Sequence, residues 1–268
     1  MNPISLTPLD LTIAASLLAV DAGASILLRL NLHQKIVIAA VRMVLQLVAI
    51  GFILRAVFQL ANPAVTGLII LIMVLIAARE AAARPERHLK NAGGFWIGLG
   101  SISAATVLTA LFALTTALRP HPWYDARYAI PLTGILLGNI LNATSLALDS
   151  FLGSISREKS AIEARLCLGS GFWKAITPYV RDAIRRALVP IVNQMAAAGV
   201  VTLPGIMTGQ ILAGLDPVEA VKYQILLMFL LAGASGLAAF VIAFGALRRL
   251  TDDRQRLRLD RLRPTARE

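Results

Sequence analysis

Long apolar runs separated by short polar segments form the main pattern of this chain. The runs do not alternate between polar and apolar residues, as strands of a barrel would. A helix needs roughly 20 mostly apolar residues to cross the hydrocarbon of a bilayer. Seven runs are predicted to be transmembrane helices, over residues 9–28, 36–58, 61–78, 94–118, 128–148, 188–213 and 221–247. The pattern predicts an all-α integral membrane protein.

Composition supports a single transmembrane domain over residues 1–268. Hydrophobic residues make up 57% of the chain and charged residues 15%, and the mean hydropathy is +0.72, which is unusual for a soluble domain. Asp21 interrupts the first run and no positive charge precedes it, so a retained helix is favoured over a cleaved signal, although residues 22–24 resemble a cleavage site. The only cysteine, Cys167, excludes an internal disulfide and a cysteine-cluster metal site.

Basic residues are unevenly distributed among the loops. Of the 26 Lys and Arg residues, 21 lie in the loops after the first, third and fifth runs and in the tail. Only Arg119, Arg127 and Lys222 fall on the other side. The positive-inside rule places the amino terminus outside and the carboxyl terminus in the cytoplasm. We therefore expect a multi-pass protein of the cell inner (plasma) membrane, and no nucleic-acid binding from the net charge of +11.

The basic tail, residues 248–268, lies on the predicted cytoplasmic side. Such a tail could bind anionic lipid or a protein partner. A solvated flank that fixes the topology is the favoured interpretation.

The predicted cytoplasmic loop at 150–187 is longer than a helix connection requires. Ile162 and Leu166 fall on one face of a short helix, and Gly169 favours a break after it. Pro178 is expected to block continuation of any helix.

The residues that follow, 179–187, place apolar side chains on one face and arginines on another. This pattern predicts a second helix that lies in the membrane surface and leads into the sixth run.

Four residues of the loop are similar to a known coupling element. Glu163, Ala164, Gly169 and Pro178 resemble the EAA-type coupling loop of ABC-transporter permeases, although Arg165 stands where that pattern has a second alanine. The stretch GVVTLPGIMTGQILAGLDPVEAVKYQI, at 199–225, closely resembles the signature of the Fet-type iron-export permease family, whose plant relatives include the aluminium-sensitivity proteins. The resemblance covers nearly the whole chain.

This resemblance implies the membrane subunit of an ABC-type exporter of iron or another metal ion. The loop would dock a separate ATP-binding subunit, with two copies of each chain, and that partner would bind ATP and Mg²⁺. No cofactor and no enzymatic site are expected here, and the sequence agrees in lacking a GxxxxGK[ST] phosphate loop. The structural alternative is a loop that only covers the end of the helix bundle.

The sixth run contains the unusual stretch LPGIMTGQILAG, at 203–214. Proline removes a backbone donor and glycine lowers helix propensity, so the helix should kink or unwind there. Membrane proteins tolerate irregular backbone only where protein or a water-filled cavity surrounds it. The fifth run adds a polar face formed by Gly138, Asn142, Ser145 and Asp149.

We expect the facing surfaces of the fifth and sixth runs to form the translocation pathway. For any single polar residue, a hydrogen bond that only holds the bundle together is equally favoured. The pathway residues are Asn139, Asn142, Asn193, Gln194, Pro204, Gly205, Met207, Thr208 and Gln210.

No predicted span contains a histidine: His33 and His88 fall in cytoplasmic loops and His121 in an outer loop. Transition-metal sites usually draw on His, Cys or paired carboxylates. Methionine sulfur and amide oxygen would ligate only weakly. The residues therefore identify no metal site, and both the cargo and the export direction rest on the resemblance.

Two charges fall inside the first two spans. Asp21 and Arg42 lie at matching depth, roughly 10 to 12 Å from the cytoplasmic edge at 1.5 Å per residue. Because an unpaired charge in hydrocarbon costs at least ~2.5 kcal/mol, an Asp21–Arg42 ion pair is predicted, with a structural role favoured over gating.

Two other classes of function remain as alternatives. An ATP-independent channel or secondary transporter would need no ATPase and usually carries internal repeats, which the two halves do not display. An intramembrane enzyme would need a nucleophile with a base at depth, and no such pair occurs.

Overall fold

The computed structural model describes residues 7–60, 62–120, 122, 124–252, 254 and 256–263. Over these residues the chain is all-helical, with a π-helical turn at Ala113–Ala117 and a 3₁₀ turn at Leu259–Arg261. The α-helices are α1 (Pro8–Leu27), α2 (His33–Leu60), α3 (Pro63–Ala83), α4 (Gly93–Phe112), α5 (Ala126–Arg157), α6 (Lys159–Cys167), α7 (Phe172–Ala197), α8 (Gly205–Leu212) and α9 (Pro217–Arg249).

Six of the described helices, α1 to α5 and α9, are long and apolar enough to cross a membrane. The prediction of an all-α membrane protein is confirmed. The run over 188–213 is not among these six, because it is divided between the end of α7, an irregular segment and the short helix α8, and its crossing of the membrane stays a prediction.

The chain divides into two compact units. The first contains α1 and α2, together with residues 212–214. These two helices pack as a hairpin, and the backbone N–H of Leu32 donates to Ser25 Oγ at 3.0 Å in the turn between them. Most of their side chains are exposed, which leaves a large apolar surface available to lipid.

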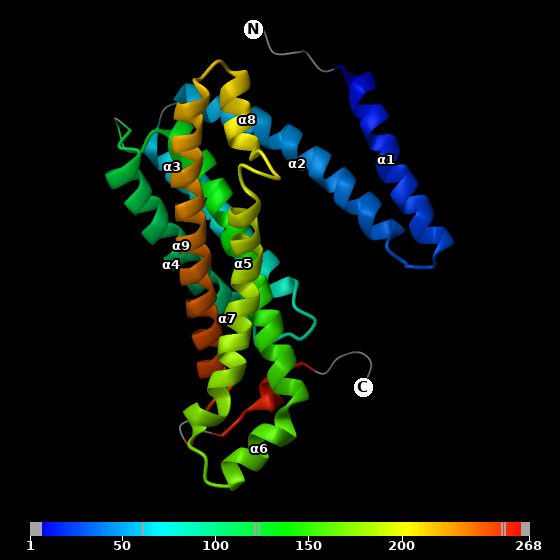
Figure 1. Ribbon diagram of the computed structural model, residues 1–268, viewed down its shortest axis with the longest axis vertical. Helices are drawn as coiled ribbons and strands as arrows, with labels where there is room; N and C mark the ends of the chain where they lie inside the picture. The colour runs from blue at the N-terminus through cyan, green and yellow to red at the C-terminus, as the bar shows by residue number, and fades with distance from the viewer. Residues whose placement is uncertain are drawn as a thin grey trace. The chain divides into compact units, whose positions relative to one another are not determined.

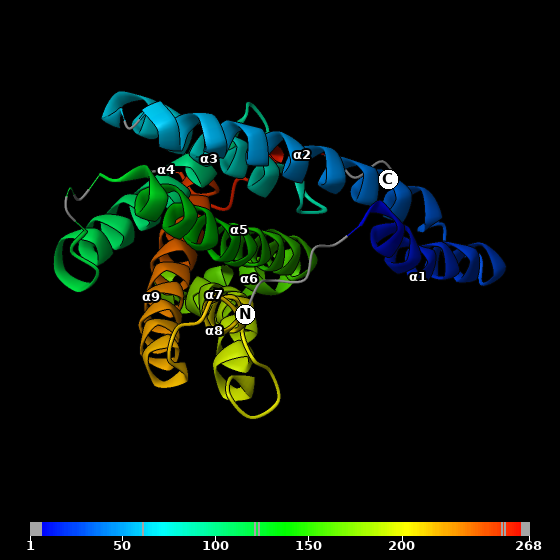
Figure 2. The same ribbon diagram turned by 90° about the horizontal axis from the view of Figure 1, so that it is seen from above.

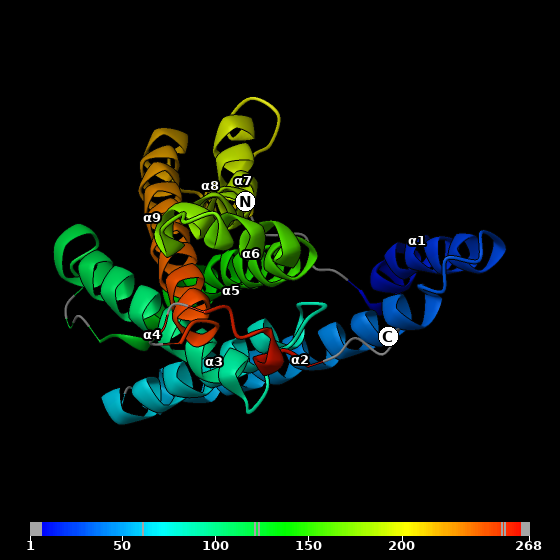
Figure 3. The ribbon, with the colours of Figure 1, turned by 90° about the horizontal axis from the view of Figure 1, so that it is seen from below.

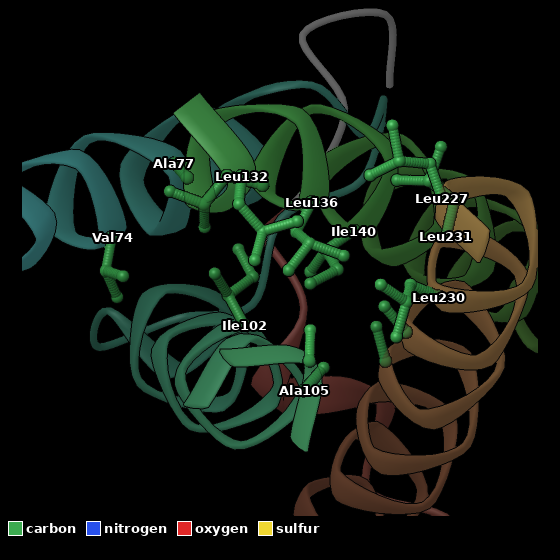
Figure 4. Close-up of a cluster of buried hydrophobic side chains, with 14 of the residues drawn as sticks. Val74, Ala77, Ile102, Ala105, Leu132, Leu136, Ile140, Leu227, Leu230 and Leu231 are labelled. Atoms are coloured by element: carbon green, nitrogen blue, oxygen red, sulfur yellow. The ribbon is translucent and has the colours of Figure 1, made fainter. Parts of the chain in front are cut away.

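The second unit is a bundle in which α3, α4, α5 and α9 enclose a core of Val, Leu, Ile and Ala side chains (Figure 4). Small residues let the helices approach closely, as is usual in membranes. A Cβ on Gly98 of α4 would lie 3.6 Å from the Ala78 carbonyl oxygen of α3, and one on Gly245 of α9 would lie 2.5 Å from Ile97 Cγ2. A hydrogen bond from Ser101 Oγ to the Ala238 carbonyl, 2.8 Å, also joins α4 to α9.

Helix α7 packs against α5 and α9 along the bundle (Figures 1 and 2). Val180, Ala183 and Ala187 are buried and the neighbouring arginines are exposed, so the predicted apolar face is confirmed. The prediction that these residues form a separate second helix is wrong, and their position in the membrane surface stays a prediction. The apolar face is buried against other helices, and α7 continues through Pro178 to Ala197.

The carboxyl-terminal segment is folded onto the same end of the bundle as α6 (Figures 1 and 3). Leu250 and Leu262 are buried, and the backbone N–H groups of Lys90 and Arg263 donate to Arg261 and His88 carbonyls at 2.7 and 2.9 Å. The solvated flank expected for the tail is therefore wrong at Leu250 and Leu262, whereas Arg254, Arg256 and Arg263 are exposed as expected. Helix α9 extends to Arg249, one residue beyond the expected start of the tail at 248.

Candidate functional site

Helix α6 is a short element that projects at one end of the bundle (Figures 1 and 3). Ile162 is its only buried residue and belongs to a hydrophobic cluster with Phe151 of α5 and Phe172 of α7. One fully buried isoleucine in a packed cluster fixes the helix in place. The rest of α6 is left largely exposed.

Glu163 and Ala164 both lie on the exposed part of α6. The Glu163 carboxylate lies 3.8 Å from Lys159 Nζ, and about half of each side chain is exposed. An exposed pair of this kind contributes little to stability. Glu163 is thus held loosely and accessible to another molecule.

Gly169 ends α6 in the left-handed conformation, with φ of 82°. The N–H of Gly169 donates to the Leu166 carbonyl and that of Ser170 to the Arg165 carbonyl, both at 3.0 Å. These two bonds form a Schellman motif, which favours glycine at this position. Since no atom lies within 4 Å of a Cβ built there, the backbone rather than packing accounts for the glycine.

Pro178 does not end a helix, contrary to the prediction. It lies in the second turn of α7 with an exposed ring, and Thr177 Oγ1 donates to the Trp173 carbonyl beside it. Side-chain hydrogen bonds of this kind help membrane helices to accommodate proline. Of the four predicted coupling residues, Pro178 alone falls outside the segment formed by α6 and its closing turn.

Two exposed apolar residues flank this turn and were missed from the sequence. Leu168 is 87% exposed and Trp173 is 58% exposed. Both fall off the buried face that contains Ile162 and Phe172. Large exposed apolar side chains beside a charged helix are typical of a protein-binding surface. The surface formed by Glu163, Ala164, Leu168 and Trp173 is called the α6 surface below.

The predicted break in the sixth run is present, but it starts before Pro204. Helix α7 ends at Ala197, Gly199 takes a φ of 84°, and the chain stays irregular until α8 begins at Gly205. Pro204 precedes the first turn of α8, where its carbonyl accepts a hydrogen bond from the Thr208 N–H at 3.1 Å. Proline suits the beginning of a helix because the first N–H groups have no intrahelical partner.

The predicted pathway residues lie on three elements. Asn139 and Asn142 are on α5, Asn193 and Gln194 are exposed in the last turn of α7, and the other five lie at the break or on α8. The contact between α5 and α7 is made by apolar residues such as Ala143 and Ala187. The exposed Asn193 and Gln194 therefore lie outside the buried contact between α5 and α7.

Two members of the polar face of α5 hold the segment after α3. Arg84 Nη1 donates to Asn142 Oδ1 at 2.8 Å, and the Glu86 N–H donates to Asp149 Oδ1 at 2.9 Å. Asn139 Nδ2 donates to the Ile135 carbonyl of its own helix at 3.3 Å. These bonds give the polar face a structural role. Its part in transport stays a prediction.

The Asp21–Arg42 ion pair also stays a prediction, although α1 and α2 pack against each other as it requires. The described residues contain no cluster of three or more His, Cys, Asp or Glu side chains suited to a metal ion. His121 lies outside the described residues.

Comparison with known proteins identifies the family. Residues 8–251 match the family described as "Uncharacterised protein family (UPF0014)". The chain is 40% identical over 229 residues to "UPF0014 membrane protein slr1647" of Synechocystis, covering 85% of this chain and 87% of that protein. No solved structure matches the chain.

Two further relatives carry names that refer to metals. "Probable iron export permease protein FetB" of Escherichia coli is 29% identical over 263 residues, 98% of this chain and 99% of the relative. "Protein ALUMINUM SENSITIVE 3" of Arabidopsis thaliana is 31% identical over 215 residues, 80% of this chain and 77% of the relative. These matches confirm the resemblance inferred from the sequence. The chain is a multi-pass membrane protein of the UPF0014 family.

Proposed function

We propose that this chain is the membrane subunit of an ATP-driven exporter and that a separate ATP-binding subunit docks on the α6 surface. The observation that carries the proposal is the attachment of α6, which is anchored by one buried isoleucine and presents Glu163, Leu168 and Trp173 outward. An amphipathic helix seated in a groove is a common way for one subunit to bind another.

The packing of α6 against the bundle is suited to transferring a movement from a bound partner to the membrane helices. Its anchor, Ile162, shares a hydrophobic cluster with residues of α5 and α7, the two helices that hold four of the nine proposed pathway residues. A movement imposed on α6 by a partner would therefore reach both helices through packed side chains. The hydrogen-bonded turn at Gly169 and the hydrophobic cluster that contains Ile162 and Phe172 join α6 to the start of α7.

We also propose iron or another metal ion as the cargo, on the strength of the name of the E. coli relative. The amide and thioether groups near the break would ligate a metal weakly, which suits release after transport. Because Asn193 and Gln194 are exposed in the single chain, we propose that a second copy completes the pathway. An ATP-independent channel or secondary transporter is the alternative.

Co-purification from gently solubilised native membranes tests the docking. We expect mass spectrometry to find a stoichiometric ATP-binding protein with the tagged wild-type chain and to lose it with Glu163→Lys. Glu219→Lys is the matched control, because Glu219 is likewise about half exposed and pairs with a lysine on its own helix, α9. Loss of the partner in both variants would indicate a general charge effect.

Activity of the purified complex tests the coupling and the cargo. We expect Fe²⁺ to stimulate ATP hydrolysis in the wild type, and we expect Gly169→Trp to abolish the stimulation without lowering expression, because a bulky residue at φ of 82° strains the turn. If the wild-type chain co-purifies with no ATP-binding protein in any of several detergents, the result instead favours an ATP-independent channel or secondary transporter.

A further inference from the structure

A groove of about 490 Å³ runs between α4 and α9 near the end of the bundle where the carboxyl-terminal segment folds back. Apart from Ser101, whose hydroxyl is bonded to the Ala238 carbonyl, its length is lined by apolar residues and glycines, namely Ile97, Gly100, Val241 and Gly245. At one end it meets three arginines, Arg248, Arg249 and Arg261. The groove thus joins an apolar channel to a strongly basic end.

The basic end has no carboxylate in its lining, as far as the described residues extend. Arg248 and Arg249 make no side-chain hydrogen bond or ion pair within that part of the chain, and Arg261 Nη1 donates to the Arg249 carbonyl at 2.6 Å. A smaller adjoining cavity, about 160 Å³, adds Lys90 and shares Arg249 and Arg261. Two or more guanidinium groups converging without a carboxylate are suited to a phosphate.

The nearby carboxylates are already engaged elsewhere. Arg258 binds Asp260 through two hydrogen bonds, of 2.8 and 2.9 Å, and Arg256 Nε donates to Asp252 at 2.9 Å. The pKa of Asp260 is lowered to about 2 by its hydrogen bonds with Arg258. These two carboxylates are thus ionised and hydrogen-bonded to other arginines. Arg261 also interacts with Asp260 through its charge, whereas Arg248 and Arg249 remain available to an outside anion.

The apolar part of the groove points to a lipid rather than to a soluble anion. Seven residues separate Val241 from Arg248 on α9, which is about 10 Å along a helix. Gly100 leaves the space open, since a Cβ built on it would have no atom within 4 Å. Trp96, in the first turn of α4 and 65% exposed, is the residue type that collects at the headgroup level of a membrane.

We propose that this groove binds an anionic phospholipid, with the phosphate held by Arg248, Arg249 and Arg261 and one acyl chain lying between α4 and α9. Basic pockets between transmembrane helices on the cytoplasmic side are suited to anionic headgroups, and the positive-inside rule places this end there. The bound lipid would join α4, α9 and the carboxyl-terminal segment.

Thermal unfolding of the purified full chain with added lipid tests the proposal. The probes are short-chain phosphatidylglycerol, phosphatidylcholine of the same chain length and inorganic pyrophosphate. We expect only phosphatidylglycerol to raise the melting temperature. Arg248→Gln/Arg249→Gln should weaken its apparent affinity about 30-fold, since each basic residue near the surface contributes about 1 kcal/mol. Arg181→Gln/Arg185→Gln removes the same charge from the exposed side of α7 and should change little.

Gly100→Leu provides a test that keeps every charge. A Cβ at this position meets no described atom within 4 Å, so the leucine side chain should occupy the groove and weaken binding of phosphatidylglycerol by about tenfold or more. This variant remains informative if the double arginine variant fails to fold. The proposal is overturned if the two lipids stabilise equally, or if Gly100→Leu binds phosphatidylglycerol as the wild type does. If pyrophosphate raises the melting temperature as much as phosphatidylglycerol does, the groove is a soluble-anion site instead. If Arg181→Gln/Arg185→Gln weakens the affinity for phosphatidylglycerol as much as the groove variant does, the binding comes from diffuse surface charge.

Discussion

Helices α2 and α9 have the same mean hydropathy, 2.5, over their most apolar stretches, yet half of that stretch in α9 is buried and none of it in α2. Hydropathy measures how readily a helix enters lipid. It does not measure how well the helix packs against a neighbour, since lipid tails are as apolar as leucine. The comparison separates insertion into the membrane from packing within it.

The difference lies in the size of the side chains. The buried face of α9 is rich in alanine, including Ala234, Ala238 and Ala243, which are fully buried. Helix α2 presents large side chains such as Leu45 and Val48, which are exposed, and a Cβ on its Gly51 would meet no atom within 4 Å. Small residues let backbones approach closely, so α9 supports a bundle while α2 remains available to lipid.

The largest effect should come from adding bulk to the packed helix. Ala238→Phe forces a large ring into the contact between α9 and α4 and should cost about 1–3 kcal/mol or more of unfolding free energy. Ile38→Phe on α2 adds a ring at a position that is 66% exposed and should cost almost nothing. Melting temperatures of the two purified variants check this contrast. An equally large loss for Ile38→Phe would mean that α2 is packed against protein in the working assembly.

A smaller effect should follow from removing one interhelical hydrogen bond. Ser101→Ala breaks the buried bond to the Ala238 carbonyl and should cost about 1 kcal/mol, the usual net value of a hydrogen bond. Ser16→Ala on α1 removes a hydroxyl whose bond, within the described part of the chain, is to the Ile13 carbonyl of the same helix. Denaturation of both variants under one set of conditions should separate them. Equal stabilities would show that the Ser101 bond contributes nothing beyond a local one.

The smallest effect should come from the carboxylates of the carboxyl-terminal segment. Hydrogen bonds from the backbone N–H and the side chain of Arg256 lower the pKa of Asp252, and side-chain hydrogen bonds from Arg258 lower the pKa of Asp260 from 3.8 to about 2. A carboxyl group whose pKa is lowered in the folded chain stabilises the fold at any pH above its pKa in the unfolded chain. This contribution is lost as the pH falls through its pKa in the folded chain. The contribution should therefore disappear between about pH 4 and pH 2.

Comparison of the wild type with Asp252→Asn/Asp260→Asn over that pH range provides the measurement. The wild type should be slightly the more stable at pH 6, and the two should converge by pH 2, because exposed pairs contribute little. A difference that stays constant with pH would assign the effect to something other than ionisation.

The features that could be predicted were those that depend on neighbouring residues. The apolar runs marked six helices that the structure confirms as candidate spans. The spacing of Val180, Ala183 and Ala187 gave the correct buried face of α7, and the break in the sixth run was expected from its proline and glycines. Each of these depends on periodicity or on backbone preference within a few residues.

The errors arose where distant segments meet. Pro178 was expected to stop a helix, but packing of α7 against α5 and α9 outweighs the local cost of proline. The tail was expected to be solvated because it is basic, although Leu250 and Leu262 within it are buried. At the α6 surface, Glu163 and Ala164 could be found from the resemblance, whereas the exposure of Leu168 and Trp173 depends on how α6 and α7 pack.

Residue order alone accounts for the membrane-inserted helices, the glycine turn after α6 and the irregular segment near Pro204, because each follows from hydropathy or from φ and ψ preferences. Tertiary packing determines which apolar helix is buried, whether α7 runs on through Pro178 and which partners Asn142 and Asp149 bind. These outcomes depend on side-chain size and on contacts between segments 58 and 63 residues apart. Such contacts leave no local pattern along the chain, so they become visible only when the helices are assembled.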